Sequence, residues 1–505
     1  MVWHIFKKDL RLLWPLVVMV AMLQFASAGI SVALGNFGDP RQLMLIADVL
    51  SGATLLGSAI LVISAVHQDT IPGVNQDWLV RPIRRGDLML AKLLFLLLAV
   101  QLPMVIADVM RSLFSGLPAG ETMFAVLLRS AVVFLTFDLP IAALATVTAN
   151  ATEAIGTMLA IWLFVVAALI IGSIIRGGAP PFSGTGMQWM VPAYWSLLAL
   201  AAAAVIIPLQ YFRRATGVAR RVVIGAAVLA PMLSYSSWAS AFALQQWFSN
   251  DPAAARPIMI SFDPDSKFGF AEGPASGGSI SLPLKVKGIA AGDIIRDDRS
   301  IIHIISSDGK TLYVGPAVNP AGGVDDFPVR PANGGEIKIY QLISLPAPVL
   351  QAVRGRQVRI EIDYSLTLLH LEVANAIAAI NGDKHMSGFG RCKTRIDAEG
   401  DDVVVGCLKT GRAPDCVSGT LQNRLNGERN PEDYLCRPDY SPLSVPYLDA
   451  VRQYEGELEY RDPKGLAKYP VDEAQVQNAD VVLRSYRPRA HFTRRLVIPN
   501  IRIGA

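Results

Sequence analysis

The most reactive side chains of this 505-residue sequence are four thiols, all in its second half: Cys392, Cys407, Cys416 and Cys436. An even number of cysteines confined to one polar stretch predicts two disulfides made in an oxidising compartment, because disulfides rarely persist in the cytosol. The alternative is four free thiols. A zinc site is not favoured, since no CxxC or HxxxH spacing accompanies them.

A second candidate for chemistry is Asp138, which lies in a long apolar stretch and is followed by Pro140. A carboxylate in the middle of a membrane costs about 2.5–3.5 kcal/mol, so it must face a protein interior or a cavity. We expect it to pair with Arg129 or with a group on another helix. It is either a pathway or gating residue or a structural hydrogen-bonding group at a proline kink. Asp48 and Asp108 lie nearer the outer ends of their apolar stretches, where we expect them to be hydrated.

A third candidate is the segment 67–94, HQDTIPGVNQDWLVRPIRRGDLMLAKLL, which lies between two apolar runs and concentrates basic charge. The simplest interpretation is that its arginines contact lipid phosphates and hold the topology, with Trp78 at the interface. The prolines and glycines of the segment predict one or two short helical pieces rather than one long helix.

Motifs for enzymatic chemistry are missing from the sequence. Gly309-Lys310-Thr311 resembles the end of a phosphate-binding loop, but the glycine required five residues before Gly309 is Ile304. Asp308-Gly309 between two β-like runs predicts a hairpin turn instead. No G-x-S-x-G or H-E-x-x-H pattern and no nucleophile–base set is present, so we expect no catalytic residues, no metal site and no cofactor in this chain.

The two halves of the chain differ sharply in charge. Residues 1–249 hold 25 charged residues and residues 250–505 hold 63, against 17% charged residues overall. Soluble domains carry about 25% charged residues. The sequence therefore predicts a helical membrane domain over 1–249 and a soluble domain over 250–505.

Seven stretches are long and apolar enough to cross a bilayer, which requires about 20 residues. They are 12–34, 43–66, 93–110, 123–148, 154–175, 191–211 and 222–246. The last is the weakest because residues 234–240 are polar. Ala26-Ser27-Ala28 resembles a signal-peptide cleavage site, but the apolar run continues to Leu34, which favours an uncleaved first helix.

The basic residues of the loops predict the orientation. With a cytosolic N-terminus, four segments lie inside: 1–11, 67–92, 149–153 and 212–221. These hold eleven Lys and Arg residues against three in the outside loops, the bias expected of cytosolic loops. An odd number of spans then leaves residues 250–505 outside, where the cysteines would be oxidised.

The second half contains short, β-branched and partly alternating segments separated by Gly, Pro, Asn and Asp, which predicts an all-β sandwich. The predicted strands are 279–289, 300–315, 336–345, 358–369, 401–408 and 480–486. The length allows one large sandwich or two small ones. A boundary is expected near 370–390, where a helix is compatible with the sequence.

The order of residues in 67–94 resembles the ABC-2 class of transporter permeases. In that family an acidic residue ending the second span is followed by a glycine, a Pro-x-Ser/Thr-Arg element and a lysine opening the third span. The matching positions are Asp69, Gly73, Pro82, Arg85 and Lys92. Asp69 stands where the family usually has Glu, and Arg84 where it has Ser or Thr. The opening residues 1–15 and the segment 180–195 are also similar to the family's first helix and outer hairpin, and the resemblance covers about residues 1–215.

The resemblance implies a permease that works as an exporter, whose ATP and Mg²⁺ belong to a separate ABC ATPase subunit. That subunit would dock under residues 67–92, the coupling segment. This segment also includes Trp78 and Arg81. The implied partners are the ATPase, a second permease chain and membrane lipid, without nucleic acid, and the implied location is the bacterial cytoplasmic (inner) membrane with a periplasmic β domain. The alternative is a membrane-anchored β-domain binding or sensor protein without transport activity.

Overall fold

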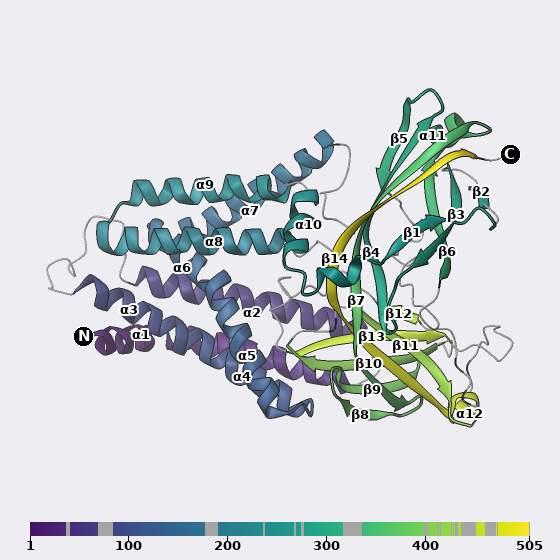
Figure 1. The fold of residues 1–505 in the computed structure, drawn as a ribbon. Helices are drawn as coiled ribbons and strands as arrows, with labels where there is room; N and C mark the ends of the chain where they lie inside the picture. Colours follow the sequence, from purple (N-terminus) through teal and green to yellow (C-terminus); the bar gives the residue numbers. More distant parts are fainter. Residues whose placement is uncertain are drawn as a thin grey trace.

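The structure of the chain, a computed structural model, consists of a helical region followed by a β-rich region (Figure 1). The N-terminus lies at the end of the helical region that is remote from the β-rich region. The described residues are 1–36, 41–68, 84–176, 190–235, 238–266, 269–273, 277–316, 336–397, 402–411, 414, 416–425, 427, 429, 433–435, 451–459, 471 and 473–503.

Seven helices of the described part are long and apolar enough to cross a membrane, and each overlaps one predicted span. They cover Val2–Ala33, Leu45–His67, Arg85–Phe114, Ala119–Val147, Ala151–Ile175, Met190–Arg213 and Thr216–Ser234. Four of these spans lie within single α-helices, namely α1 (Val2–Asn36), α2 (Arg41–His67), α7 (Ala151–Arg176) and α9 (Thr216–Ser234). The prediction of a seven-helix apolar region is confirmed in this respect.

The boundaries of the first and last spans differ from the prediction. The amphipathic opening is not a separate helix, because α1 runs from Val2 through Pro15 without a break. The predicted span 222–246 is two elements, since α9 ends at Ser234 and a separate helix, α10, covers Trp238–Trp247. The backbone leaves the helical conformation at Tyr235, whose hydroxyl donates to the carbonyl oxygen of Leu169 in α7.

The remaining spans each contain one wider, π-helical turn. The third joins α3 (Arg85–Phe95), η2 (Leu96–Gln101) and α4 (Leu102–Phe114), and the fourth joins α5 (Ala119–Val133), η3 (Phe134–Asp138) and α6 (Leu139–Val147). The sixth joins α8 (Met190–Pro208) to η4 (Leu209–Arg213). In the first two, Pro103 and Pro140 follow the turn closely. Proline lacks the N–H that would close the normal i−4 bond, so the ladder shifts there.

The β-rich region holds three antiparallel sheets. The first is built around β3 (Gly277–Lys287), which pairs with β1 (Met259–Phe262), β2 (Gly269–Gly273) and β6 (Ile337–Pro346). The second has the order β13 (Val451–Glu459), β10 (Asp402–Thr410), β9 (Gly390–Ile396) and β8 (Asp383–Met386). The third has the order β12 (Asp433–Leu435), β11 (Cys416–Asn423), β14 (Ala479–Arg502), β7 (Gln357–Ala378), β4 (Asp293–Ser306) and β5 (Thr311–Pro316). All six predicted strands lie in these sheets.

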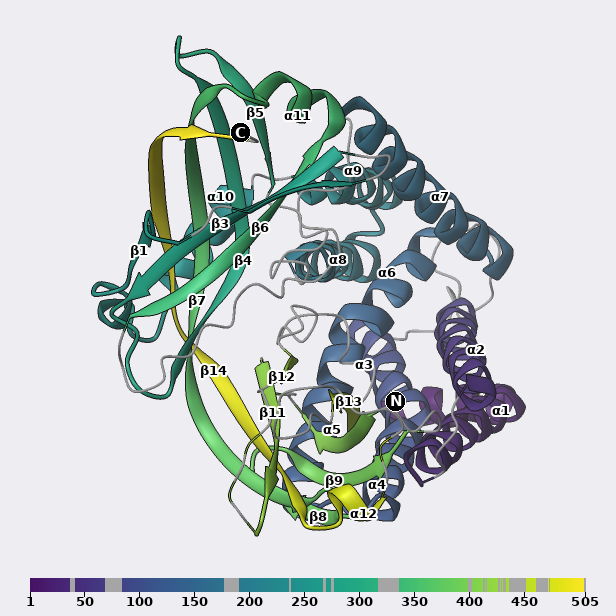
Figure 2. The same cartoon turned by 90° about the vertical axis from the view of Figure 1, so that its right-hand side faces the viewer.

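Two long strands, β7 and β14, run side by side through the whole β-rich region (Figure 2). At about 3.4 Å per residue for antiparallel strands, the 22 residues of β7 and the 24 residues of β14 extend about 75 Å and about 80 Å along the chain. One end of the pair packs against the β3 sheet around Leu282, Ile304 and Ile362. The other end packs against the β10 sheet around Phe389 and Val405. The region therefore has two hydrophobic cores, one in each of two lobes that share two strands.

The segment 369–383, which was expected to be compatible with a helix, is not helical. Residues up to Ala378 continue β7, in register with the first part of β14. Register shifts in β14 at Ser485/Tyr486 and Pro488/Ala490 mark the passage between the lobes. Bulges of this kind bend a strand and increase its twist, which is how one strand pair serves two cores.

Candidate functional site

The predicted coupling residues are only partly described. Five of them lie outside the described residues: Asp69, Gly73, Trp78, Arg81 and Pro82. Arg84 and Arg85 are exposed at the start of α3. The Nη1 of Arg85 donates to the carbonyl oxygen of Phe212, 2.5 Å away at the end of the sixth span. Leu88, one turn further, packs with Ile5, so these arginines lie at the same end as the N-terminus.

The third described coupling residue, Lys92, is buried, with 4% of its surface exposed. Its Nζ donates to Asp9 Oδ2 at 2.8 Å and to the carbonyl oxygen of Ala65 at 2.7 Å. The three partners belong to α3, α1 and α2. Lys92 therefore ties three helices together and is not available for direct contact with another protein.

Further polar contacts tie the remaining helices at this end. The two ring nitrogens of His67 lie 3.0 Å from the carbonyl oxygen of Ile63 and 3.1 Å from that of Thr148. Arg220 of α9 donates to the carbonyl oxygen of Val147 and to Glu153, the latter at 3.1 Å. The contact of His67 with Ile63 lies within α2, but the other three join the ends of different helices, so this face of the helical region is cross-linked.

A partly open cavity of about 220 Å³ lies in the helical region, between α1, α2, the third span and the fourth span. Its charged lining residues are Asp48, Asp108, Arg111, Arg129 and Asp138. Its neutral polar lining residues are Gln24, Ser27, Ser51, Thr54, Ser58 and Gln101. Polar side chains gathered around an internal cavity of an apolar helix bundle are the usual mark of a functional site.

Asp138 is held by the third span, not by Arg129. Gln101 Nε2 donates to Asp138 Oδ2, and Ser130 Oγ donates to Gln101 Oε1 at 2.7 Å. These two bonds fix which way the Gln101 amide points. Asp138 and Gln101 are 1% and 3% exposed, and each ends a π-helical turn. Of the two predicted pairings, the one with another helix is confirmed.

Arg129 instead pairs with Asp108. Its Nη1 donates to Asp108 Oδ2, which joins α5 to α4. Asp108 is 6% exposed, so the expectation that it is hydrated at an outer end is wrong. The antiparallel packing of α4 and α5 brings the two charges together and supplies the compensation that a buried carboxylate needs. Asp48 is exposed; its hydration stays a prediction.

The β-rich region contacts the hairpin between α4 and α5 through Arg391 of β9. Arg391 Nη1 donates to the carbonyl oxygen of Ser115 at 3.1 Å, while Nε and Nη2 donate to Asp383 at 2.8 and 2.7 Å. The guanidinium holds the pKa of Asp383 below its ordinary value. Gly116 follows with φ +74°, and an added Cβ would lie 2.6 Å from Arg391 Nη1.

A second contact between the regions involves α10 and the following turn. Gln245 Nε2 lies 3.3 Å from His491 Nε2, and the backbone N–H of His491 donates to Ser249 Oγ at 2.9 Å. Arg489 donates to Asp251 at 2.8 Å and holds the pKa of that carboxyl below its ordinary value. The α10 segment is thus anchored on β14 where the two lobes meet.

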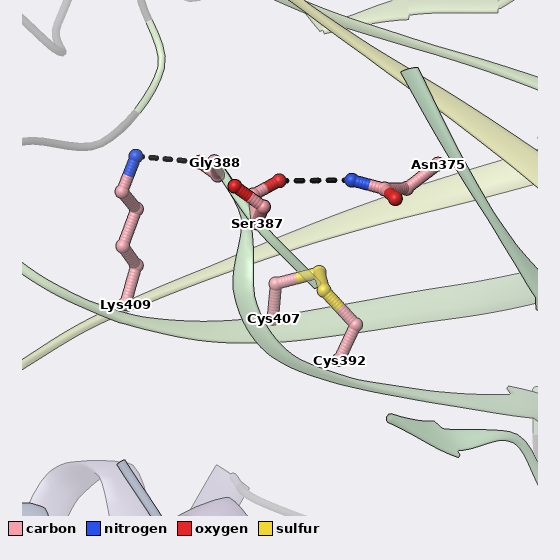
Figure 3. The surroundings of a disulfide bond; sticks show 6 residues. All are labelled: Asn375, Ser387, Gly388, Cys392, Cys407 and Lys409. Carbon is pink, nitrogen blue, oxygen red and sulfur yellow. Dashed lines mark hydrogen bonds between the residues drawn. A yellow bond between two sulfur atoms is a disulfide. The ribbon is translucent and has the colours of Figure 1, made fainter. Parts of the chain in front are cut away.

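Cys392 and Cys407 form a disulfide, both of whose residues lie in the described part of the chain (Figure 3). It joins directly opposed residues of β9 and β10, with 4.0 Å between the Cα atoms. Beside it, Lys409 Nζ donates to the carbonyl oxygen of Gly388, and Asn375 Nδ2 to that of Ser387. Cys416 is also disulfide-bonded, and Cys436 lies outside the described residues. A disulfide in this region indicates an oxidising compartment.

Comparisons with protein-family models and with curated proteins find no match to this chain. Within the described ranges, no group of three or more His, Cys, Asp or Glu side chains is placed to hold a metal ion. The candidate functional site is therefore defined by its geometry alone.

The sequence analysis did not single out the cavity residues Gln24 and Gln101, nor Ser130, which donates a hydrogen bond to Gln101. A signal for one of them was present, because Gln101-Leu102-Pro103 and Asp138-Leu139-Pro140 share the pattern polar–Leu–Pro. Each pattern places a polar side chain at the end of a π-helical turn. Such turns are frequent at functional sites.

Proposed function

We propose that this chain is the membrane-spanning permease subunit of an ABC transporter of the ABC-2 class, working as an exporter with a separate ATPase subunit. The charged cavity is the single observation that carries the proposal. Helices that merely anchor a β domain have no reason to surround an internal cavity with five ionisable side chains, given the cost of charge in an apolar setting.

The cross-linked helix ends support a route from the coupling segment to the cavity. Residues 67–92 run from the end of α2 into α3, and Lys92 fastens the last turn of α3 to Asp9 of α1 and to the carbonyl oxygen of Ala65 in α2. The same helices supply cavity residues further along, including Ser58 and Gln101. A push on the segment by a closing ATPase would move these helices as a unit, a shared rigid element for coupling.

The location we propose is the bacterial cytoplasmic membrane, with the N-terminus in the cytosol and the β-rich region in the periplasm. An odd number of crossings, such as the seven candidate helices would make, puts the two ends of a chain on opposite sides of a membrane, and the basic loops favour a cytosolic N-terminus. The Cys392–Cys407 disulfide fits an oxidising space for the β-rich region.

Charge reversal of the exposed arginines tests the coupling. The chain is purified with its candidate ATPase, and the double variant Arg84→Glu, Arg85→Glu is compared with Lys7→Glu, Arg221→Glu, which changes the charge of the same face equally. We expect the first to lower ATP hydrolysis by the complex about tenfold or more, because like charges across an interface repel the partner. We expect the second to have little effect.

Unchanged hydrolysis and assembly in the Arg84, Arg85 variant would contradict the coupling role. If no ATPase copurifies with the wild-type chain, the alternative of a membrane-anchored β-domain sensor replaces the proposal.

A further inference from the structure

The cavity in the helical region contains two oxygen atoms that the described residues leave unsatisfied. Asp138 Oδ1 and Gln24 Oε1 are buried and have no hydrogen-bond partner. Both residues line the cavity, Asp138 at the end of η3 and Gln24 in α1. Buried polar atoms are nearly always hydrogen-bonded, so each exception calls for an unseen partner.

Both unsatisfied atoms are acceptors, and neither amide can be turned to correct this. Gln24 Nε2 donates to the carbonyl oxygen of Val100 at 3.5 Å, and a reversed amide would place two oxygens face to face there. Gln101 is fixed by its bonds to Asp138 and Ser130. The missing partner must therefore bring hydrogen-bond donors.

The charges of the lining indicate the sign of the partner. The cavity has three carboxylates and two guanidinium groups, which leaves a net charge of −1 when all are ionised. Arg129 is already paired with Asp108. Asp138, by contrast, receives only the neutral amide of Gln101 on one oxygen. An isolated buried carboxylate is strongly unfavourable unless a proton or a cation neutralises it.

We infer that the cavity binds a primary ammonium group, with Asp138 as its counter-ion and Gln24 as a second acceptor. An ammonium group carries three N–H donors and one positive charge, so it brings both the donors and the charge that these two side chains lack. A proton on Asp138 would supply the charge but leave Gln24 unsatisfied. A cavity of about 220 Å³ holds a group the size of a small amine rather than a drug-sized molecule. The inference concerns the cavity itself and does not depend on an ATPase partner.

Charge-selective labelling tests this inference on the purified full-length chain. Ser58 is buried in the cavity lining, and the variant Ser58→Cys is treated with 2-aminoethyl methanethiosulfonate or with its sulfonate analogue. The described cysteines of the native chain are all disulfide-bonded. For the Ser58→Cys thiol we expect a ratio of ammonium-reagent to sulfonate-reagent labelling rates that is about tenfold or more above the same ratio at an exposed reference thiol, Leu425→Cys.

Adding Asp138→Asn to Ser58→Cys should lower the ratio of ammonium to sulfonate rates to the value of the Leu425→Cys reference. The control is Asp48→Asn, which removes the same charge at an exposed position of the lining and should change this ratio less. Excess methylammonium chloride should slow labelling of Ser58→Cys relative to sodium chloride at equal ionic strength, and only when Asp138 is present. A parallel arm with vesicles of ethanolamine or choline phospholipid distinguishes a free amine from a lipid headgroup as the source.

The inference is overturned if neither reagent reacts with the Ser58→Cys thiol, because the cavity then does not admit such a group. It is equally overturned if the ratio is insensitive to Asp138→Asn, or if no amine protects the thiol. Unchanged ATP hydrolysis in the Arg84→Glu, Arg85→Glu variant would contradict the coupling role but would not change the expected labelling of Ser58→Cys.

Discussion

At the scale of single residues, Lys92 was predicted to contact a partner subunit, but its side chain contacts Asp9 and Ala65 of the same chain. The Lys92–Asp9 pair is buried, joins three helices and lies at the end of the proposed coupling segment, residues 67–92. A lysine at this position can transmit movement of α3 to α1 and α2 without touching an ATPase. Its role is to position helices rather than to form an interface.

The buried pair predicts a non-additive mutational pattern. Lys92→Met should destabilise the helical region by about 3–5 kcal/mol, because removing one partner leaves the other charge buried. Adding Asp9→Leu should recover most of this loss, since a buried pair can often be replaced by apolar side chains. Unfolding in detergent, followed for the single and double variants, measures both effects.

The control for this prediction is Lys8→Met, since Lys8 is 43% exposed and 3.6 Å from Asp9, and we expect it to cost less than about 1 kcal/mol. Equal and additive losses from Lys92→Met and Asp9→Leu would show that the pair does not act as a unit.

At the scale of elements, the hairpin between α4 and α5 connects the cavity to the β-rich region. Asp108 and Arg129 lie on its two arms, and Ser115 and Gly116 form its tip against Arg391. A movement of β9 relative to the helices would therefore pull on the hairpin whose arms line the cavity. The tip depends on a left-handed backbone at Gly116 (φ +74°), which glycine adopts without strain.

Replacing the tip glycine tests the closeness of this contact. Gly116→Ala should destabilise the chain by about 1 kcal/mol or more, because a Cβ is strained at positive φ and would meet Arg391. Gly120→Ala is the matched control, since Gly120 lies in α5 with open space around it, and it should be neutral or stabilising. Melting temperatures of the two variants in detergent provide the comparison.

If the contact with Arg391 causes part of the loss of stability, Arg391→Ala should lower the melting temperature less when it is added to Gly116→Ala than when it is made in the wild-type chain. Indistinguishable melting temperatures for Gly116→Ala and Gly120→Ala would mean that the hairpin tip is not constrained in this way.

At the scale of the whole molecule, the seven-helix arrangement separates two faces of opposite character. The end near the N-terminus carries exposed arginines, and the other end carries a disulfide-bonded, two-lobed β region (Figure 1). The long strands β7 and β14 make the two lobes one continuous structure, anchored at Arg391 in one lobe and at His491 near the junction.

Labelling of intact cells checks the orientation of these faces. A membrane-impermeant maleimide should modify Leu425→Cys, which is 79% exposed in the β-rich region. It should modify Arg84→Cys only after permeabilisation, because the basic end of the helical region is expected in the cytosol. Immediate labelling of Arg84→Cys in intact cells, with protection of Leu425→Cys, would reverse the proposed topology.

The sequence by itself determined the features that depend on neighbouring residues. Apolar runs located seven long helices, β-branched alternation located six strands, and Asp308-Gly309 marked the hairpin turn between β4 and β5. These follow from local composition, because the length of an apolar run and the period of a pattern are properties of the chain alone.

Only the tertiary structure decided which polar groups meet. Asp138 meets Gln101 from 37 positions away, Lys92 meets Asp9 from 83, and Cys392 faces Cys407 because of the register of β9 and β10. It also decided that residues after 370 continue a strand, since pairing with β14 overrides their local preference. Partners distant in the chain are chosen by packing and by the need to neutralise buried charge, and no local pattern records that choice.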